Sequence, residues 1–413
     1  MVHLLRHVSV LVAATLIVAC SPAAPSAKPG AGGSGTNTAW QQVLDAAKNE
    51  GTLLVYHNLF PGAESTKVAD EFKAQTGVTV DFISGLGAPL SQRIRTEVGG
   101  NAPSADIFEG SSQFLLPMQK DNFFVSVKDK VPSLQEPADT WRVHPGYMSE
   151  SQELLVSRAL TQYAGHLTVN TSKISPSDYP TSYHDLAMNP KFKGKVGYVD
   201  PKTTGDTAAV FIRQGYVGQA YTIDDVWSLY ANQQMMLFPG PGDQGAAAGR
   251  GEVPIAIGAT FGNLLQLANA NAPIKILAFA DAPIVSNPTT MGMLKSSAHP
   301  NAALVFLNWF YGKDGQEYIN KMLQLPGSLR RDVPSYTHEA LEPEIVGGSK
   351  RGPIVALTLA QSLLAVQLNS SGLFQKLTEG ISQAEFTGGV NDYIKKWEDE
   401  QGGPKHEGVV LKD

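Results

Sequence analysis

Short apolar runs alternate with amphipathic helical patterns in the first third of the chain, and this alternation constrains the fold more than any other feature. Three runs have the length and apolar content of buried strands: TLLVYH (52–57), VTVDFI (78–83) and ADIFEG (105–110). Between the first two, Val68 and Phe72 have the i, i+4 spacing of one helix face, and Gly77 ends the pattern. Strands separated by helices are typical of βαβ units, so we predict an α/β protein with mostly parallel sheets.

The alternation of strand and helix patterns begins again after a less regular central part of the chain, with the predicted strands GKVGYVD (194–200) and VPIAIGA (253–259). The chain of 413 residues is also longer than one hydrophobic core usually serves. We therefore expect two lobes with a cleft between them. The patterns assign residues 40–160 and 275–335 to lobe 1 and residues 161–274 to lobe 2. Residues 336–413 are expected to form a C-terminal helical segment that packs on the lobes.

The N-terminus has the pattern of an export signal. Arg6 precedes an apolar run over 8–19 that is too short to cross a membrane comfortably as a helix, so residues 1–19 are predicted to be a signal peptide. Residues 17–20, Ile-Val-Ala-Cys, resemble the lipobox of bacterial lipoproteins, in which the thiol is acylated. We expect Cys20 to carry the lipid and residues 20–39 to form the anchor and a flexible tether. The alternative is an ordinary secretory signal with an incidental cysteine.

Charge and cysteine content narrow the classes of partner. Without residues 1–19, the chain has 31 basic and 38 acidic side chains and no basic tract, so nothing in it attracts nucleic acid. Cys20 is the only cysteine, which excludes intramolecular disulfides. We expect a monomer that is exported and held by its lipid on the outer face of a membrane, in the periplasm or at the cell surface.

The strand pattern also predicts where a ligand binds. In open parallel sheets, ligands lie beyond the carboxyl ends of the strands, where helix N-termini present free N–H groups. This rule selects a set dominated by hydroxyls and glycines: His57, Asn58, Ser84, Gly85, Gly87, Ser111, Ser112, Thr203, Thr204, Gly205, Asp206, Thr207, Gly258, Ala259 and Thr260. Such residues can hydrogen-bond a small polar or anionic guest.

Each of these residues also has a structural interpretation. Ser112 and Asp206 are typical helix caps, His57 is typical of a hydrogen-bonded histidine at a strand end, and glycines after strands often form turns. Signals for chemistry are weaker still, because the chain has no G-x-S-x-G, H-E-x-x-H, P-loop or EF-hand pattern and no cysteine cluster. We therefore predict no catalytic residue, no cofactor and no metal site.

The lipoprotein signal and six phrases together resemble a known family. The phrases occur in matching order over roughly residues 50–335: GTLLVYHN, FKAQTGVTVDFISG, ADIFEGSS, LTVNTSKI, YHDLAMNPKFKGKVGYVDPKTTGDT and HPNAALVFLNWFYGKDGQEYI. The chain is similar to the extracellular solute-binding proteins of bacterial ABC importers, in the branch of ferric-ion, phosphonate, thiamine and polyamine binders. The resemblance implies a two-lobed, type II "Venus flytrap" with hinge crossings, and permease and ATPase subunits as partners.

The resemblance also bears on the ligand. It implies contacts from Ser84, Gly85, Ser111, Ser112 and the loop 203–207. Ferric-binding relatives hold iron with adjacent tyrosines near the strand IAIGATFGN, where this chain has Phe261 and Gly262, so phenolate ligation is impossible there. Three other tyrosines keep a ferric role open: Tyr147, Tyr163 and Tyr198.

The function that we expect is capture of a small polar, anionic solute for import by an ABC permease. Two alternatives remain from the residues alone. One is an exported hydrolase with His57 or Ser111 in its chemistry. The other is a ligand-sensing partner of a membrane receptor, which would share the fold.

Overall fold

The computed structural model of the protein describes residues 34–60, 62–158, 167–280, 282–286, 288–350 and 352–411. The predicted signal peptide, Cys20 and Tyr163 lie outside these residues. Helix α1 (Ser34–Glu50) begins inside the stretch 20–39 that the sequence predicts to be a tether, and this part of the prediction is wrong. The helix packs on α10 through Trp40, Val43 and Leu44, which explains why it forms.

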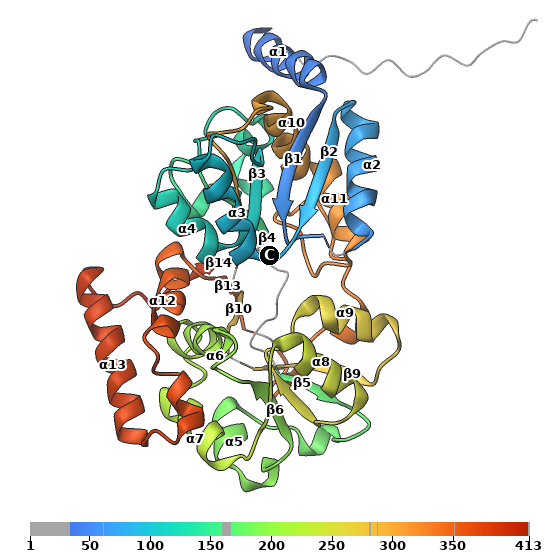
Figure 1. Cartoon of the computed structure of the whole chain (residues 1–413). Coiled ribbons are helices and arrows are strands. Elements are labelled where there is room, and N and C mark those ends of the chain that lie inside the picture. The colour runs from blue at the N-terminus through green and yellow to red at the C-terminus, as the bar shows by residue number, and fades with distance from the viewer. Residues whose placement is uncertain are drawn as a thin grey trace, which may run out of the picture.

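The chain forms two α/β lobes, one above the other in Figure 1. Lobe 1 is built on a five-stranded sheet in the order β2 (Thr79–Ser84), β1 (Thr52–His57), β3 (Ile107–Ser111), β11 (Thr289–Met293) and β4 (Leu155–Arg158). Six helices accompany it: α1, α2 (Glu64–Thr76), α3 (Gly87–Gly99), α4 (Ser112–Lys120), α10 (Pro300–Tyr311) and α11 (Lys313–Met322). The predicted βαβ units at 52–110 are confirmed, since β1 pairs in parallel with both β2 and β3.

Lobe 2 is built on a six-stranded sheet in the order β12 (Glu344–Val346), β9 (Ile274–Phe279), β5 (Leu167–Asn170), β8 (Ile255–Ile257), β6 (Val196–Val199) and β7 (Met236–Phe238). Its helices are α5 (Tyr183–Met188), α6 (Asp206–Val210), which continues as a π-helix (Phe211–Val217), α7 (Ile223–Asn232), α8 (Pro241–Arg250) and α9 (Phe261–Asn269). Short 3₁₀ turns complete both lobes: Pro132–Gln135, Ala138–Thr140, Pro145–Met148, Pro176–Asp178, Pro190–Phe192 and Glu339–Leu341.

Both sheets are mixed, whereas the sequence predicts mostly parallel ones. In lobe 1, β11 runs antiparallel to β3 and β4, and in lobe 2, β5 runs antiparallel to β8 and β9. β5 and β11 are the first strands of each sheet after the chain passes from one lobe to the other. No local pattern in the sequence reveals the direction of these two strands.

The predicted lobe boundaries need two corrections. β9 lies in the lobe 2 sheet, although the boundary at 274 assigns 275–279 to lobe 1. β12, in the segment predicted to be helical, also joins the lobe 2 sheet through β9. The reason is burial: β9 is apolar along nearly its whole length and fills the place between β5 and β12.

A third, small sheet joins the lobes, and we call it the hinge sheet. It consists of β10 (Ile284–Ser286), β13 (Ile354–Ala356) and β14 (Val409–Val410). β10 lies in the chain between β9 of lobe 2 and β11 of lobe 1. β14 pairs antiparallel with β13, so the C-terminal end of the chain is fixed at the hinge.

The C-terminal segment lies between and beside the lobes (Figure 1). It contains α12 (Leu359–Ser370), a 3₁₀ turn (Gln375–Glu379) and α13 (Gln383–Glu400). α12 contacts α4 of lobe 1 and α6 of lobe 2, and its first residue, Leu359, packs on lobe 1 whereas Leu368 packs on lobe 2. A capping box between Thr358 and Gln361 starts this helix, which explains why the apolar run 353–368 is split into β13 and α12.

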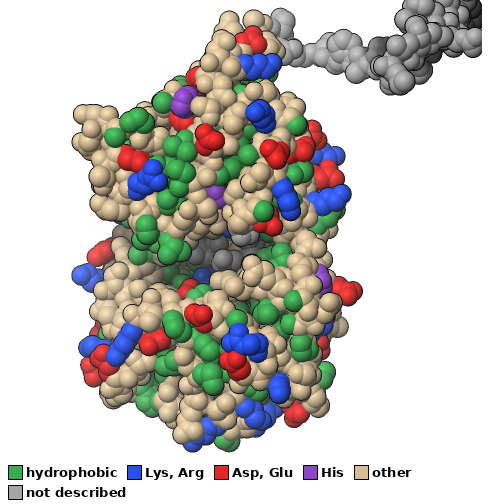
Figure 2. Space-filling view, turned by 45° about the vertical axis from the view of Figure 1, so that its right-hand side comes forward, with side chains coloured by type: hydrophobic (Ala, Val, Ile, Leu, Met, Phe, Trp, Pro, Cys, Tyr) green, Lys and Arg blue, Asp and Glu red, His purple; other side chains and the backbone are tan. Residues whose placement is uncertain are grey.

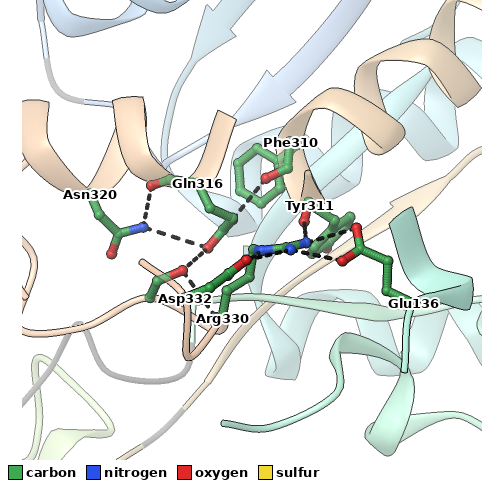
Figure 3. Close-up of polar contacts among 8 residues, drawn as sticks. Glu136, Phe310, Tyr311, Gln316, Asn320, Arg330 and Asp332 are labelled. Atoms are coloured by element: carbon green, nitrogen blue, oxygen red, sulfur yellow. Dashed lines mark hydrogen bonds and ion pairs between the residues drawn. The ribbon is translucent and has the colours of Figure 1, made fainter. Parts of the chain in front are cut away.

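A buried arginine closes lobe 1 on the side of α10. Arg330 is 3 % exposed, and its guanidinium bonds both carboxylate oxygens of Glu136 (3.0 and 2.8 Å) and of Asp332 (2.9 and 3.0 Å). It also donates to the carbonyl of Tyr311 (3.2 Å; Figure 3). The guanidinium lies over the ring of Trp141. All of its donor nitrogens are thus engaged within the protein.

No helix in the described ranges is long and apolar enough to span a membrane.

Candidate ligand-binding cleft

A cavity of about 540 Å³ opens between the lobes, within the size range of small-molecule sites. Figure 2 shows the hollow between the two lobes on one face of the molecule. Lobe 1 contributes the loop between β1 and α2, the end of β4, and the end of α11 with the residues that follow it. The lining residues of lobe 1 are Asn58, Leu59, Gly62, Glu64, Arg158, Met322, Leu323, Gln324 and Leu325. Lobe 2 contributes the start of α9 and its exposed face: Thr260, Phe261, Gly262, Asn263, Leu265, Gln266 and Asn269.

His57, at the end of β1, does not line the cavity but positions the residues of the next loop that do. It is fully buried, and its Nδ1 accepts the backbone N–H groups of Leu59 (3.1 Å) and Phe60 (3.3 Å). Its ring packs edge-on against Phe82. Burial, with the positive charge of Arg158 as a second cause, lowers the pKa of His57 from 6.5 to about 4. The neutral imidazole therefore turns the chain so that Asn58 and Leu59 line the cavity.

Glu109, on β3, is a buried carboxylate just behind the lobe 1 wall. Its Oε1 accepts the hydroxyl of Ser157 (3.0 Å) and its Oε2 accepts the backbone N–H of Asn58 (3.2 Å). Burial raises the pKa of Glu109, and the charge of Arg158 opposes this effect. The carboxylate thus ties the ends of β1, β3 and β4 together at the edge of the cleft.

Arg158, the last residue of β4, is the cation of this site. It lines the cavity and is half-buried, and its Nε is buried without a hydrogen-bond partner in the part of the chain that the structure describes. Burial lowers the pKa of Arg158, whereas the charge of Glu109 raises it, although the two side chains form no close ion pair among the described residues. This environment differs from that of Arg330, whose guanidinium is fully paired. A partly desolvated cation without a partner favours an anionic guest.

The lobe 2 wall is the exposed face of α9. Asn263, Gln266 and Asn269 follow one another at spacings of three and so project on adjacent turns. The hydroxyl of Thr260 donates to Oδ1 of Asn263 and fixes that side chain at the start of the helix. Gly258, at φ 79°, makes the left-handed turn that leads from β8 into α9.

The structure brings Asn58 and Thr260 of the predicted set to the cavity, from opposite lobes. The other thirteen are not among the residues that line it. Ser84 is exposed at the end of β2, and Gly85 donates its N–H to the carbonyl of His57 (3.0 Å). Gly87 packs against Phe114, because a Cβ there would lie 2.2 Å from the ring. Ala259 is buried in the core.

Of the two predicted residues at the start of α4, Ser112 is engaged within the protein. Ser112 is buried, and its hydroxyl donates to the carbonyl of Pro288 (3.1 Å). Ser111 precedes the helix without a capping hydrogen bond from its side chain. Their role as ligand contacts stays a prediction.

The predicted loop 203–207 lies beside α12. Thr203 donates to the carbonyls of Asp200 (2.8 Å) and Pro239 (2.7 Å), and the hydroxyl of Thr204 accepts the N–H of Asp206 (3.2 Å). The remaining two are also in contact with neighbours: Thr207 bonds the hydroxyl of Tyr230, and a Cβ on Gly205 would lie 3.1 Å from the side chain of Asn369. The polar groups of this loop are thus largely satisfied internally.

The tyrosines that keep a ferric role open lie away from the cavity lining where the structure describes them. Tyr147 donates its hydroxyl to the carbonyl of Leu357 (3.0 Å), and Tyr198 is buried. Burial raises the pKa of both phenols, which opposes the phenolate form that iron requires. Within the described ranges, no group of three or more His, Cys, Asp and Glu side chains could hold a metal ion.

Sequence reasoning missed Arg158 and the face of α9. Arg158 lies at the carboxyl end of a strand, where ligands are expected. The run LLVSR (154–158) lies in the middle of the chain, where the strand and helix patterns are less regular, so this strand was not predicted. The spacing of three between Asn263, Gln266 and Asn269 is a signal in the sequence that these amides lie on one face of the predicted helix. Gln324 and its neighbours reach the cleft only through the packing of α11, which no local pattern reveals.

Comparison with known proteins agrees with this architecture. The family model described as bacterial extracellular solute-binding protein matches residues 103–350. No curated protein matches the chain. Among solved structures, iron-bound HitA from Pseudomonas aeruginosa superposes with a TM-score of 0.58 at 20 % identity, over 78 % of this chain and 98 % of that one.

Two further solved structures are similar. The periplasmic binding protein AfuA from Actinobacillus pleuropneumoniae, with fructose-6-phosphate bound, has a TM-score of 0.54 at 17 % identity over 85 % of this chain and 98 % of that one. IdiA (FutA) from Trichodesmium, in complex with iron and citrate, has a TM-score of 0.55 at 18 % identity over 80 % and 98 %. These likenesses confirm the two-lobed fold, and the match of the family model shows that the chain belongs to the bacterial extracellular solute-binding protein family.

Proposed function

We propose that this protein captures a small anionic solute in the interlobe cleft and delivers it to the permease of an ABC importer, without catalysing a reaction. The observation that carries the proposal is Arg158, which lines the cavity without a hydrogen-bond partner among the described residues. The solved relatives named above hold iron, iron with citrate, or a sugar phosphate. The lining has one cation, Arg158, and one carboxylate, Glu64. An anion is the guest that it suits, because the buried Nε of Arg158 has no hydrogen-bond partner among the described residues.

The magnitudes support a role for both lobes. Micromolar affinity requires about 8 kcal/mol. A charge-assisted hydrogen bond contributes about 1.5–3 kcal/mol, so Arg158 alone is insufficient and several polar contacts must add to it. Those contacts come from Asn58 and Gln324 on lobe 1 and from α9 on lobe 2. Binding therefore favours closure of the lobes on the guest.

Calorimetric titration of the mature protein tests the proposal. The panel contains inorganic phosphate, acetate, gluconate and glucose 6-phosphate as anions, with glucose and spermidine as uncharged and cationic probes. We expect binding of at least one anion that Arg158→Gln weakens at least tenfold. Arg250→Gln, on the surface of lobe 2, is the control and leaves affinity unchanged. Binding of only uncharged or cationic probes, or full affinity in Arg158→Gln, contradicts the proposal.

Export and anchoring through Cys20 complete the proposed function. The support is the export signal and the lipobox-like Ile17–Cys20 segment in the sequence. Metabolic labelling with a fatty acid in the native host should label the wild type and leave Cys20→Ala unlabelled. Absence of label from the wild type, or its persistence in Cys20→Ala, contradicts the anchor and leaves solute binding untouched.

A further inference from the structure

Side-chain amides are the commonest polar groups in the cleft. Five of them line it, two from lobe 1 and three from α9 of lobe 2: Asn58, Gln324, Asn263, Gln266 and Asn269. Apart from Asn263, which accepts the hydroxyl of Thr260, none of these amides has a hydrogen-bond partner within the ranges described. Donors and acceptors therefore line the cavity from both sides, and four of the five amides have no partner among the described residues.

The chemistry of the amide indicates what that guest carries. Each Asn or Gln presents two N–H donors and a carbonyl acceptor, whereas a hydroxyl both donates and accepts, so the two groups match. A bare inorganic anion accepts hydrogen bonds only, and amide oxygens turned toward it would be unfavourable. An array of amides consequently suits a guest with several hydroxyl groups.

The charges of the lining restrict the guest further. Arg158 is the one cation among the lining residues that the structure describes, and Glu64 is the one carboxylate. Because only one cation is present and the carboxylate repels negative charge, the lining favours a guest with one anionic group over a di- or tricarboxylate. The partly exposed apolar side chains of Leu265 and Met322 offer surfaces for the C–H faces of a carbon skeleton.

Resting on the proposed function, we infer that the solute is a polyhydroxylated organic anion of about monosaccharide size. Arg158 binds its single anionic group, and the amides of Asn58, Gln324 and α9 bind its hydroxyls. A sugar phosphate and a sugar acid share this chemistry. Gln266 and Asn269 are then specificity-determining residues, because they recognise hydroxyls and not charge.

Matched pairs of probes test the inference by calorimetry on the mature protein. Glucose 6-phosphate is compared with n-hexyl phosphate, and gluconate with hexanoate, so that each pair keeps the anionic group and loses the hydroxyls. We expect the hydroxylated member of at least one pair to bind at least tenfold more tightly. The pair that shows the difference identifies phosphate or carboxylate as the anionic group.

Variants on α9 separate this inference from the proposed function. Gln266→Leu and Asn269→Leu should each weaken the hydroxylated probe five- to tenfold and leave its hydroxyl-free partner unchanged, whereas Arg158→Gln weakens both. Gln92→Leu, at an exposed amide on α3, is the control and changes neither. Equal or tighter binding of the hydroxyl-free probes overturns this inference and leaves anion capture standing. Binding of no anion, with binding of an uncharged or cationic probe, overturns both.

Discussion

The guanidinium of Arg158 and the carboxylate of Glu109 interact electrostatically at the edge of the cleft without forming a close ion pair among the described residues. Glu109 is instead held by the hydroxyl of Ser157 and the backbone N–H of Asn58. The arrangement keeps the positive charge of Arg158 available to a guest. The carboxylate is also near enough to raise the pKa of Arg158, so its negative charge offsets part of the positive electrostatic potential that a guest meets.

Neutralising Glu109 should therefore strengthen anion binding. We expect Glu109→Gln to raise the affinity for an anionic probe by a few-fold, about 1 kcal/mol, and to lower the melting temperature because the amide cannot replace both accepted hydrogen bonds. Calorimetry on the single and double variants with Arg158→Gln checks the cause. The gain in affinity should vanish in the Arg158→Gln background, and an equal change in both backgrounds would contradict the role given to Arg158.

His57 should make stability depend on pH. Its pKa is lowered to about 4 in the folded protein, from 6.5 in the unfolded chain. Between these values the unfolded chain binds a proton that the folded protein does not, so stability is complete above pH 6.5 and falls as the pH decreases toward 4. The loss amounts to about 3 kcal/mol at pH 4 relative to pH 7.

Denaturant unfolding at several pH values measures this effect. His57→Asn keeps an acceptor for the N–H groups of Leu59 and Phe60 and should remove most of the pH dependence. His338→Asn is the matched control, because His338 makes the same type of turn with Ala340 but is only half-buried. A pH dependence that is the same in the wild type and in His57→Asn would show that His57 is not its source.

The sequence predicts the fold well where contacts are local and poorly where they are distant. Val68 and Phe72 lie on the buried face of α2 as their spacing predicts, and β1, β2 and β3 form where the apolar runs place them. The sequence predicts mostly parallel sheets, but β5 and β11 run antiparallel to their neighbours and make both sheets mixed.

The candidate site shows the same division. Asn58 and Thr260 follow strands that the pattern identifies, and the structure places both at the cavity. The loop 203–207 was selected by the same rule, but α12 lies beside it, more than 150 positions later in the sequence. No local pattern reveals that contact, nor the approach of Gln324 to the cleft. Whether this loop contacts the solute stays a prediction.

Removal of the Arg330 guanidinium should destabilise lobe 1. The two carboxylates that it binds belong to Glu136 and Asp332, in segments far apart in the sequence (Figure 3). Breaking a buried ion network from one side costs about 3–5 kcal/mol, although both carboxylates are partly solvated here, so we expect Arg330→Ala to cost about 2–3 kcal/mol in unfolding free energy. Arg331→Ala, at the exposed neighbouring residue, should cost less than about 0.5 kcal/mol. Equal effects of the two substitutions would contradict this structural role.

The tail that ends in β14 should stiffen the hinge sheet. Beyond its pairing with β13, it is held by Gln361, whose Nε2 donates to the carbonyls of Lys405 (2.6 Å) and Glu407 (3.0 Å). Lys405 in turn donates its N–H to the hydroxyl of Tyr216 in lobe 2 (3.1 Å). These contacts fix a third strand to the two that join the lobes.

Gly408 is the residue at which this third strand can be detached. A Cβ there would lie 2.3 Å from Val355 and 2.8 Å from the carbonyl of Ala356, so Gly408→Val should release β14 from β13 while both lobes remain folded. Spin labels on Lys67→Cys in lobe 1 and Lys193→Cys in lobe 2, in a Cys20→Ser background without other thiols, should then report a broader interlobe distance distribution than in the parent. Gly388→Ala, at a helical glycine of α13 with open space around it, is the control and leaves the distribution unchanged. A distribution as narrow in Gly408→Val as in the control would mean that β14 does not stiffen the hinge sheet, because the loss of the third strand would then have had no mechanical consequence.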